Sequence, residues 1–428
     1  MLDAHIGLVC PPKKDYICIF NENWTFKMVI STEIAIIGVK DMPNKILILT
    51  GHYGEGHKQA ALAIKKAIDH KRTNAQVTII DPAKETHPFL DSVSRRFFIN
   101  GVKIFPSLYH YFYEKTRYLN YAGMMLKGLN RIGVNRVFGL VSHIDPDVIV
   151  STCPIAAGIM STLKEYGLID VPTVTVITDH TVHSYWVYQN TDIYIAGSEG
   201  VRQGLKKLGI NGENIKVTGI PINPKFSDHF NRRSLKEKYG LKDALPTILI
   251  SGGGCGILKG ILSTLKVLEK IPFKIQMIIT CGHNRRLYHR IKQQMEHSKH
   301  DIFVTGFVDY MEELMAVSDI MITKAGGLTV SEAVMMALPM LLYKPIGGQE
   351  KDNTKFLVNR KAALLANDDK DLYIKIIEML TNPDLISTIQ NNVQAIQTRK
   401  DPASLAAQVI LNALPKPSKI LYSEEYLL

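Results

Sequence analysis

The chain has 428 residues, of which 46% are hydrophobic and 21% charged, and its formal net charge at pH 7 is +11. This length suits two domains that each bury a core, and the composition excludes a disordered chain. A basic surface attracts polyanions, which include nucleic acids, phosphorylated substrates and anionic lipid headgroups. Charge alone does not choose among them.

The cysteines are scattered along the chain, and no two of them form a CxxC pair. This pattern favours a reducing compartment and provides neither a disulfide framework nor a thiolate zinc site. No stretch approaches the roughly 20 apolar residues needed to cross a bilayer. We therefore expect any membrane contact to be peripheral.

Residues 1–41 differ in character from the rest of the chain and lack the pattern of a signal peptide. Met42 comes directly before Pro43 and the first strong strand pattern. We expect folding to begin near Met42, with residues 1–41 as an N-terminal extension that is not part of the fold.

From Lys45 onward, short β-rich runs alternate with helical patterns. The patterns predict a helix at 58–70 and strands at 46–50, 77–80, 148–151, 173–178, 193–196 and 216–218. Continuously apolar strands separated by helices are typical of a parallel sheet that is covered on both faces. The sequence GIPINP at 219–224 breaks regular structure and predicts a domain boundary.

The alternation restarts after a predicted helix at 232–239 and ends with a helical pattern at 403–414. Strands are predicted at 247–251, 276–280, 302–305, 320–322 and 340–343. Two successive βα series predict an α/β protein with two Rossmann-like, doubly wound domains facing a central cleft. We expect an N-terminal domain at 42–224, a C-terminal domain at 225–414 and a tail at 415–428.

Residues 95–140 depart from this rhythm, because many Lys and Arg residues and a single acid, Glu114, are interleaved with aromatic side chains. Such a mixture suits the lipid–water interface. A pair of core helices with a basic exposed face explains the pattern equally well.

The first chemical motif is TGHYGEGH at 50–57, between a predicted strand and a helix. Glycines permit a tight turn and close approach of a substrate to the amides at a helix start. Gly56 is therefore a candidate substrate contact. The imidazole of His57 is a candidate general base or phosphate ligand.

The second motif, TDHTVHSYW at 178–186, follows a predicted strand, at the edge where open α/β sheets bind ligands. Asp179 is a candidate to orient or deprotonate a hydroxyl, and a helix N-cap is the structural alternative. Trp186 is a candidate to stack on an apolar or sugar surface.

Two further glycine-rich motifs lie in the second half. Gly253 and Gly254, in SGGGCG at 251–256, are candidates to cradle a diphosphate. The stretch TKAGGLTVSEA at 323–333 places glycines before a helix that carries Glu332, a candidate ribose ligand. Gln349 and Glu350 in the following loop are candidates to bind sugar hydroxyls.

Together these motifs resemble the monogalactosyldiacylglycerol synthase and processive diacylglycerol β-glucosyltransferase family. The resemblance extends from Lys45 to about Leu414 and is most specific in GGLTxxEA and the downstream PxGGQExxN. It implies a GT-B fold, a lipid acceptor bound by the N-terminal domain and a UDP-sugar bound by the C-terminal domain.

The resemblance also implies residue roles. His57 corresponds to the histidine at the reaction centre, and Trp186 lies where the acceptor lipid is contacted. The implied donor contacts are Phe307 and Val308 for uracil, Glu332 for ribose, Gly326, Gly327 and Thr329 for the diphosphate, and Gln349 and Glu350 for the sugar.

The expected reaction is inverting transfer of a hexose, preferably glucose, to diacylglycerol or a glycosyl-diacylglycerol, with His57 or Asp179 as base. No cofactor or metal is expected. Asp145 and Asp147 spell a DxD motif but read as turn residues, and His180 with His183 lacks a third zinc ligand. The expected location is the cytoplasm, peripherally on the anionic inner face of a bacterial cell membrane.

Two other functions remain open. A UDP-sugar epimerase uses the same two-domain architecture and a similar donor site, and a peripheral lipid-binding protein without catalysis fits the basic aromatic segment. Nucleic-acid binding is not expected, because no recognition motif accompanies the basic residues.

Overall fold

The structure is a computed structural model that describes residues 43–51, 55–71, 73–82, 84, 111, 113–117, 134–254, 260–345, 347–397 and 401–415. It also gives the backbone of two short antiparallel strands, β1 (Ile17–Ile19) and β2 (Lys27–Val29). The chain divides into two compact units, Met1–Pro43 and Asn44–Leu428. The larger unit contains all the candidate site residues.

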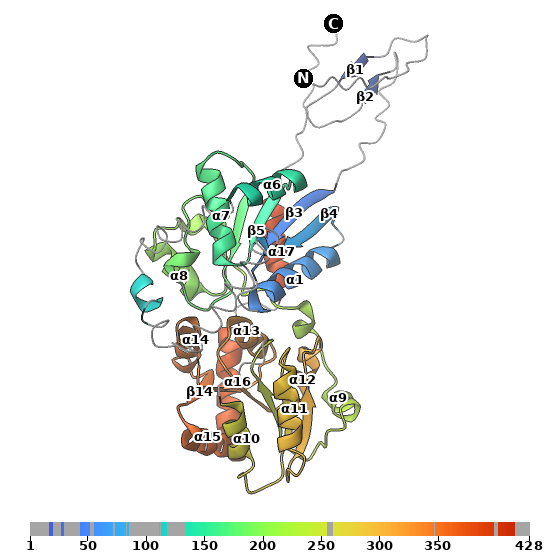
Figure 1. The fold of residues 1–428 in the computed structure, drawn as a ribbon, viewed down its shortest axis with the longest axis vertical. Coiled ribbons are helices and arrows are strands. Elements are labelled where there is room, and N and C mark those ends of the chain that lie inside the picture. The colour runs from blue at the N-terminus through green and yellow to red at the C-terminus, as the bar shows by residue number, and fades with distance from the viewer. Residues whose placement is uncertain are drawn as a thin grey trace. The chain divides into compact units, whose positions relative to one another are not determined.

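The first half of the larger unit is built on a parallel six-stranded sheet in the order β4-β3-β5-β6-β7-β8 (Figure 1). Its strands are β3 (Asn44–Leu49), β4 (Ala75–Ile80), β5 (Val148–Ser151), β6 (Thr173–Val176), β7 (Ile193–Ala196) and β8 (Ile215–Val217). The helices described in this half are α1 (Glu55–His70), α6 (Val134–Ile144), α7 (Pro154–Glu165) and α8 (Glu199–Lys207).

The second half is built on another parallel six-stranded sheet, in the order β11-β10-β9-β12-β13-β14. Its strands are β9 (Thr247–Ser251), β10 (Gln276–Thr280), β11 (Asp301–Thr305), β12 (Ile320–Thr323), β13 (Met340–Tyr343) and β14 (Ala363–Ala366). Its helices are α9 (Arg232–Lys238), α10 (Ile261–Leu268), α11 (Arg285–Gln294), α12 (Met311–Val317), α13 (Gly327–Met335), α14 (Gln349–Val358), α15 (Asp369–Thr381) and α16 (Pro383–Ile396).

The local sequence explains these elements. The central strands are continuous runs of buried aliphatic residues, as two-sided burial requires. Several helices begin where a polar side chain accepts a hydrogen bond from the first turn, as Ser198 does for α8 and Asn284 for α11. The prediction of two doubly wound parallel sheets is confirmed, and β14 is the strand of these two sheets that the prediction missed.

The last helix, α17 (Pro402–Asn412), returns to the first half of the chain. Its Ala403, Ala406, Ala407 and Ile410 are buried in the core formed by α1 and the first sheet. Figure 1 shows α17 in red beside α1 in blue. The predicted C-terminal domain, 225–414, thus ends in a helix that packs on the first sheet. The domain boundaries at 41, 224 and 414 stay predictions.

We predict that Ile410→Ala lowers the free energy of unfolding by about 2–4 kcal/mol, because Ile410 is fully buried under the first sheet. Leu405→Ala on the same helix is the matched control. Its side chain is 39% exposed, so the expected loss is below about 0.5 kcal/mol. Urea unfolding followed by the fluorescence of the buried Trp186 measures both. Equal losses would show that α17 does not stabilise the first half.

Candidate active site

The strand order of each sheet reverses at one point, and the glycine-rich motifs follow the strands at these points. In the second sheet, β9 and β12 are neighbours that lead into turns at 252–254 and 324–327. In the first sheet, β3 and β5 are the corresponding pair, and α1 follows β3. Open α/β sheets bind ligands beyond the carboxyl ends of their strands at such switch points. The topology therefore marks one candidate site in each half.

The turn after β9 is closely packed. Gly253 has φ +73°, which favours glycine. A Cβ on Gly254 would lie 2.5 Å from Cγ of Glu55 in the first turn of α1. Gly254 is therefore packed against the other half of the molecule, and a larger residue does not fit at this position.

Helix α13 begins at the turn after β12. Gly326 is its N-cap and has no capping side chain, so the first amides of α13 have no side-chain acceptor from the cap. Thr329 lies in the first turn, and Glu332 lies one turn further along. Burial raises the pKa of Glu332 to about 7, and the nearby charge of Glu312 adds to this effect.

Gln349 and Glu350 form the start of α14. The preceding Gly348 has φ +79° and ψ −133°, a backbone conformation that is essentially restricted to glycine. Gln349 Oε1 accepts a hydrogen bond from the Tyr185 hydroxyl at 3.4 Å. Glu350 forms an ion pair of 2.8 Å with Lys324, a residue of the turn after β12. Lys324 belongs to the motif TKAGGLTVSEA, but no role was predicted for it.

Phe307 and Val308 follow β11. The Phe307 side chain is 44% exposed, and its ring stacks on His283 with centroids 4.3 Å apart. The His283 amide donates a hydrogen bond to the carbonyl of Gly254. His283 was not predicted, because no local pattern shows that the loops after β10 and β11 meet here.

His57 lies in the first turn of α1, and its Nδ1 is 3.1 Å from the hydroxyl of Thr178 at the end of β6. Its ring contacts Trp186 edge-on, with centroids 6.0 Å apart. Burial lowers the pKa of His57 to about 4, although a backbone hydrogen bond at Thr152 opposes the shift. The imidazole is therefore neutral near pH 7.

Asp179 is buried and contacts the same Trp186 that lies against His57. Its carboxylate accepts a hydrogen bond of 3.1 Å from the indole nitrogen of Trp186. Burial raises the pKa of Asp179 to about 6, and the indole hydrogen bond partly offsets this shift. Asp179 therefore orients Trp186. The indole itself is fully buried, so its predicted contact with the acceptor stays a prediction.

Gly56 also lies in the first turn of α1. A Cβ added to it would meet no atom within 4 Å, so the backbone here is open to a ligand. Its predicted acceptor contact stays a prediction. The other residues of this motif, His52, Tyr53 and Gly54, lie outside the described residues.

The two halves meet at these same motifs. Gly327 packs on the carbonyl oxygen of Thr178 so closely that a Cβ there would clash. The His180 amide donates to Asn353 Oδ1, and its Nε2 lies 3.1 Å from the Ser331 hydroxyl. The cluster of His57, Asp179, His180 and Trp186 therefore belongs to one site with the start of α13.

The residues considered above as metal ligands form hydrogen bonds within the protein. The Asp147 carboxylate accepts a hydrogen bond from the amide of Lys45 at the start of β3, and Asp145, two residues before Asp147, has φ +50°. His180 bonds to Ser331, whereas His183 bonds to the carbonyl of Tyr113. No group of three potential ligands among His, Cys, Asp and Glu occurs in the described part of the chain.

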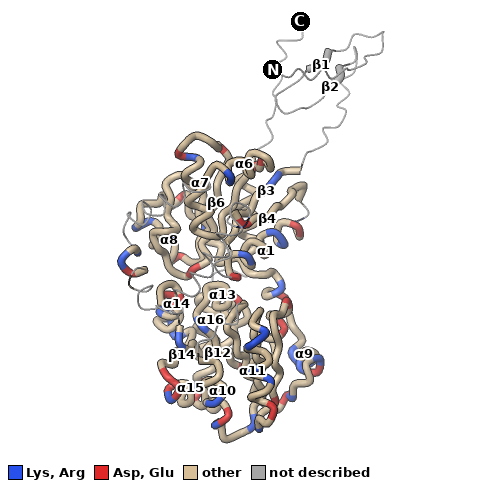
Figure 2. The backbone as a smooth tube through the Cα atoms, in the orientation of Figure 1, with Lys and Arg blue, Asp and Glu red and all other residues tan. Residues whose placement is uncertain are grey.

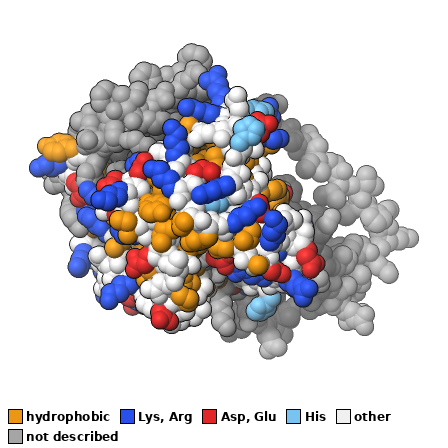
Figure 3. All heavy atoms as spheres, turned by 90° about the horizontal axis from the view of Figure 1, so that it is seen from below, with side chains coloured by type: hydrophobic (Ala, Val, Ile, Leu, Met, Phe, Trp, Pro, Cys, Tyr) orange, Lys and Arg blue, Asp and Glu red, His pale blue; other side chains and the backbone are white. Residues whose placement is uncertain are grey.

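Most of the basic aromatic segment at 95–140 lies outside the described residues. Its described residues 113–117 contact the donor half, because Arg117 forms an ion pair of 2.5 Å with Asp352 of α14. Figure 2 shows Lys and Arg on elements around both sheets, including α1 and α11, and the face in Figure 3 mixes apolar patches with charges of both signs. Within the described ranges, no helix has the length and apolarity required to span a membrane.

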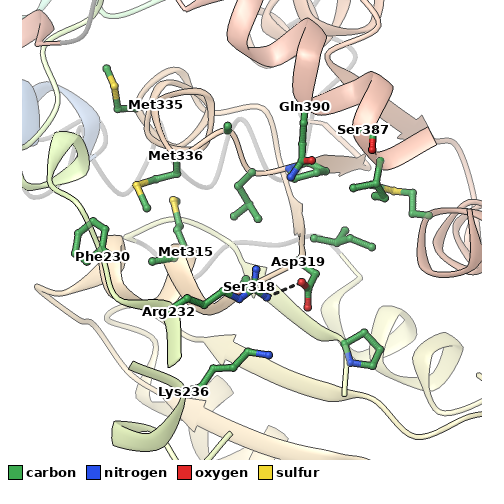
Figure 4. Close-up of a pocket in the computed structure, with 18 of the residues that line it drawn as sticks. Phe230, Arg232, Lys236, Met315, Ser318, Asp319, Met335, Met336, Ser387 and Gln390 are labelled. Atoms are coloured by element: carbon green, nitrogen blue, oxygen red, sulfur yellow. Dashed lines mark hydrogen bonds and ion pairs between the residues drawn. The ribbon is translucent and has the colours of Figure 1, made fainter. Parts of the chain in front are cut away.

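A cavity of about 1040 Å³ lies elsewhere in the second half (Figure 4). It is lined by residues that precede β9, β12 and β13, with Met315 and Met336 beside the Arg232–Asp319 ion pair. This is the amino edge of the sheet, opposite the switch point. Because it contains none of the candidate site residues, we do not assign it to the nucleotide.

Two family models match the chain in sequence. The model for monogalactosyldiacylglycerol (MGDG) synthase matches residues 57–222, and the glycosyltransferase family 28 C-terminal domain matches residues 247–409. The matches contain the candidate residues of the first and second halves respectively, apart from Gly56.

Among curated proteins, the chain is 29% identical over 386 residues to the processive diacylglycerol beta-glucosyltransferase of Bacillus subtilis, covering 89% of this chain and 97% of that protein. The protein of the same name from Bacillus pumilus is 29% identical over 372 residues, with 86% and 94% covered.

Solved structures show the fold. The Acinetobacter baumannii MurG structure superposes with a TM-score of 0.57 at 13% identity and covers 86% of this chain and 100% of its own. Anabaena Alr3699/HepE in complex with UDP-glucose has a TM-score of 0.53 at 16% identity, with 86% and 99% covered. The fold is GT-B, as predicted. Both family models are matched in order, and the chain resembles the monogalactosyldiacylglycerol synthase and processive diacylglycerol glucosyltransferase family over most of its length.

Proposed function

We propose that this protein transfers glucose from UDP-glucose to diacylglycerol, or to a glycosyl-diacylglycerol, with inversion at the anomeric carbon. The observation that carries the proposal is that the switch points of the two sheets adjoin each other, so that the half-buried, neutral His57 lies near the glycine turns of the second sheet. The names of the Bacillus relatives support glucose and diacylglycerol as the substrates.

The second half would bind the donor. In this proposal the amides at Gly253, Gly254, Gly326 and Gly327, together with Thr329, hold the diphosphate at the start of α13. The positive end of the helix dipole then stabilises UDP as it leaves. Phe307 and Val308 hold the uracil, Glu332 accepts the ribose hydroxyls, and Gln349 with Glu350 binds the hexose.

His57 would act as the base. When Nδ1 keeps the proton and bonds to Thr178, Nε2 carries the lone pair that accepts the proton of the acceptor hydroxyl. The hydroxyl oxygen then attacks the anomeric carbon as the bond to the diphosphate breaks, and one displacement inverts an α-linked donor to a β-glycoside. Asp179 is the less suitable base, because its carboxylate already holds the Trp186 indole.

We also propose that the enzyme works peripherally at an anionic membrane surface, on the inner face of a bacterial cell membrane. The excess of Lys and Arg among the aromatic side chains at 95–140 supports this location, because cationic and aromatic groups suit the lipid–water interface. Diacylglycerol resides in the bilayer. If the first half of the chain, which would bind this acceptor, lies at the membrane surface, diacylglycerol can enter the site without passing through water.

Sugar transfer to vesicles tests the proposed reaction. We expect label from UDP-[14C]glucose to enter a lipid-soluble product when the vesicles contain diacylglycerol and phosphatidylglycerol, and UDP-[14C]galactose to be the poorer donor. His57→Ala should lower kcat by roughly 10²–10⁴-fold, whereas the matched control His289→Ala, at an exposed position of α11, should retain activity.

Absence of a lipid product from the wild-type protein, while UDP-glucose still binds, would contradict diacylglycerol transfer. Conversion of the free UDP-sugar to its epimer in the same reaction would identify the epimerase alternative instead.

Glu332 provides a test of the donor site by pH. Its pKa is about 7 in the folded protein against 4.5 when unperturbed, so the folded state binds more protons than the unfolded state between these values. The stabilisation from this group is complete below pH 4.5 and is lost as pH rises through 7. Glu332→Gln removes the buried charge that forms at high pH. The variant should therefore have a Tm a few degrees higher than wild type at pH 8, with a smaller difference at pH 5.

The same variant should bind UDP roughly tenfold more weakly at pH 8, because it loses a charged acceptor for the ribose hydroxyls. Scanning calorimetry at the two pH values and titration calorimetry with UDP measure the two effects. A Tm difference that does not depend on pH would contradict the raised pKa, and unchanged UDP affinity would contradict the ribose contact.

A further inference from the structure

The ion pair between Lys324 and Glu350 joins two parts of the donor site. Lys324 lies in the turn between β12 and α13, and Glu350 is the second residue of α14. Their Nζ and Oε1 atoms are 2.8 Å apart, and the side chains are only 21% and 10% exposed. Partial burial strengthens the attraction and reduces its screening by salt.

Lys324 is held beside the turns that we assign to the diphosphate. The Thr323 hydroxyl donates to the carbonyl of Ser251, which fixes the end of β12 against the end of β9. The Gly326 amide donates to the carbonyl of Lys324. A Cβ on Gly253 would lie 3.9 Å from Cε of Lys324, so the lysine stem lies in van der Waals range of the turn after β9.

Glu350 has a second proposed task, which is to accept hydroxyls of the hexose. A carboxylate is an acceptor only, and an oxygen engaged by an ammonium group accepts a hydroxyl less well. Without donor, Glu350, which is suited to bind the sugar, is therefore paired with Lys324, which is suited to bind the phosphates.

We propose that donor binding exchanges the partners of this ion pair. The diphosphate of the UDP-sugar takes Lys324 from Glu350, and the released carboxylate turns to the hexose hydroxyls. UDP alone must also break the ion pair, but it carries no sugar with which Glu350 can bond. The exchange thus favours the intact UDP-sugar over UDP, which helps the spent nucleotide to leave. This inference rests on the proposed function, because it assumes that UDP-sugar binds at the start of α13.

Titration calorimetry with UDP and UDP-glucose tests the exchange. Glu350→Gln keeps the side-chain size and removes the charge that holds Lys324. We expect this variant to bind UDP roughly fivefold more tightly than wild type and UDP-glucose no more tightly, so that the preference for the sugar nucleotide falls. Lys324→Ala should weaken both ligands by roughly tenfold, and Lys324→Arg should restore most of the affinity.

Two comparisons isolate the ion pair. In a Lys324→Ala background, Glu350→Gln should no longer tighten UDP binding, because no cation remains to be released. Asp301→Asn is the matched control. It removes an acidic partner at an equal 2.8 Å from Lys242, at the start of β11, and should leave both affinities unchanged.

The inference is overturned if Glu350→Gln leaves UDP affinity unchanged or lowers it, or if its effect persists without Lys324. These outcomes leave the proposed function intact, because wild-type protein would still bind UDP-glucose. If the wild-type protein bound neither UDP nor UDP-glucose, the proposed function would be contradicted, and so would the proposed exchange.

Discussion

The first turn of α13 packs directly on the backbone at the end of β6, where the Cα of Gly327 leaves no room for a side chain beside the carbonyl oxygen of Thr178. The hydroxyl of the same Thr178 bonds to His57, and the next two residues supply the carboxylate that orients Trp186 and the histidine that bonds to Ser331. The short segment 178–180 therefore contacts His57, Trp186 and the donor half. Displacement of this segment would change these contacts together.

Burial at this junction sets the protonation states on which the proposed chemistry depends. Burial lowers the pKa of His57 and raises that of Asp179 at this junction, and burial within the second half raises the pKa of Glu332. A neutral imidazole is available as a base near pH 7, but Glu332 becomes harder to charge, and this costs stability in the protein without donor. Active sites commonly lose stability where buried groups are arranged for a ligand and not for the folded chain itself.

The sequence was most informative where structure follows from local pattern. Buried parallel strands are continuous apolar runs, so 148–151, 193–196 and 247–251 were predicted with the bounds that the structure has. Strand β14 was missed because it consists of alanine and leucine, which favour a helix over a strand and carry no β-branched signal. Neither the packing of α17 on the first sheet nor the pairing of Lys324 with Glu350 was predicted, because both depend on contacts between segments far apart in the chain or on separate elements. The glycine motifs did mark the candidate site, since a strand, a tight turn and a helix follow one another in sequence.

A crystal structure of the protein with UDP-glucose tests the central claim most directly, because the nucleotide either lies at the junction of the two halves or does not. We predict the uracil beside Phe307 and Val308, the diphosphate at the first turn of α13 within reach of Lys324, and the anomeric carbon facing His57. A nucleotide in the cavity beside Arg232 and Asp319, at the opposite edge of the second sheet, would contradict the assignment of the donor site and the mechanism built on it.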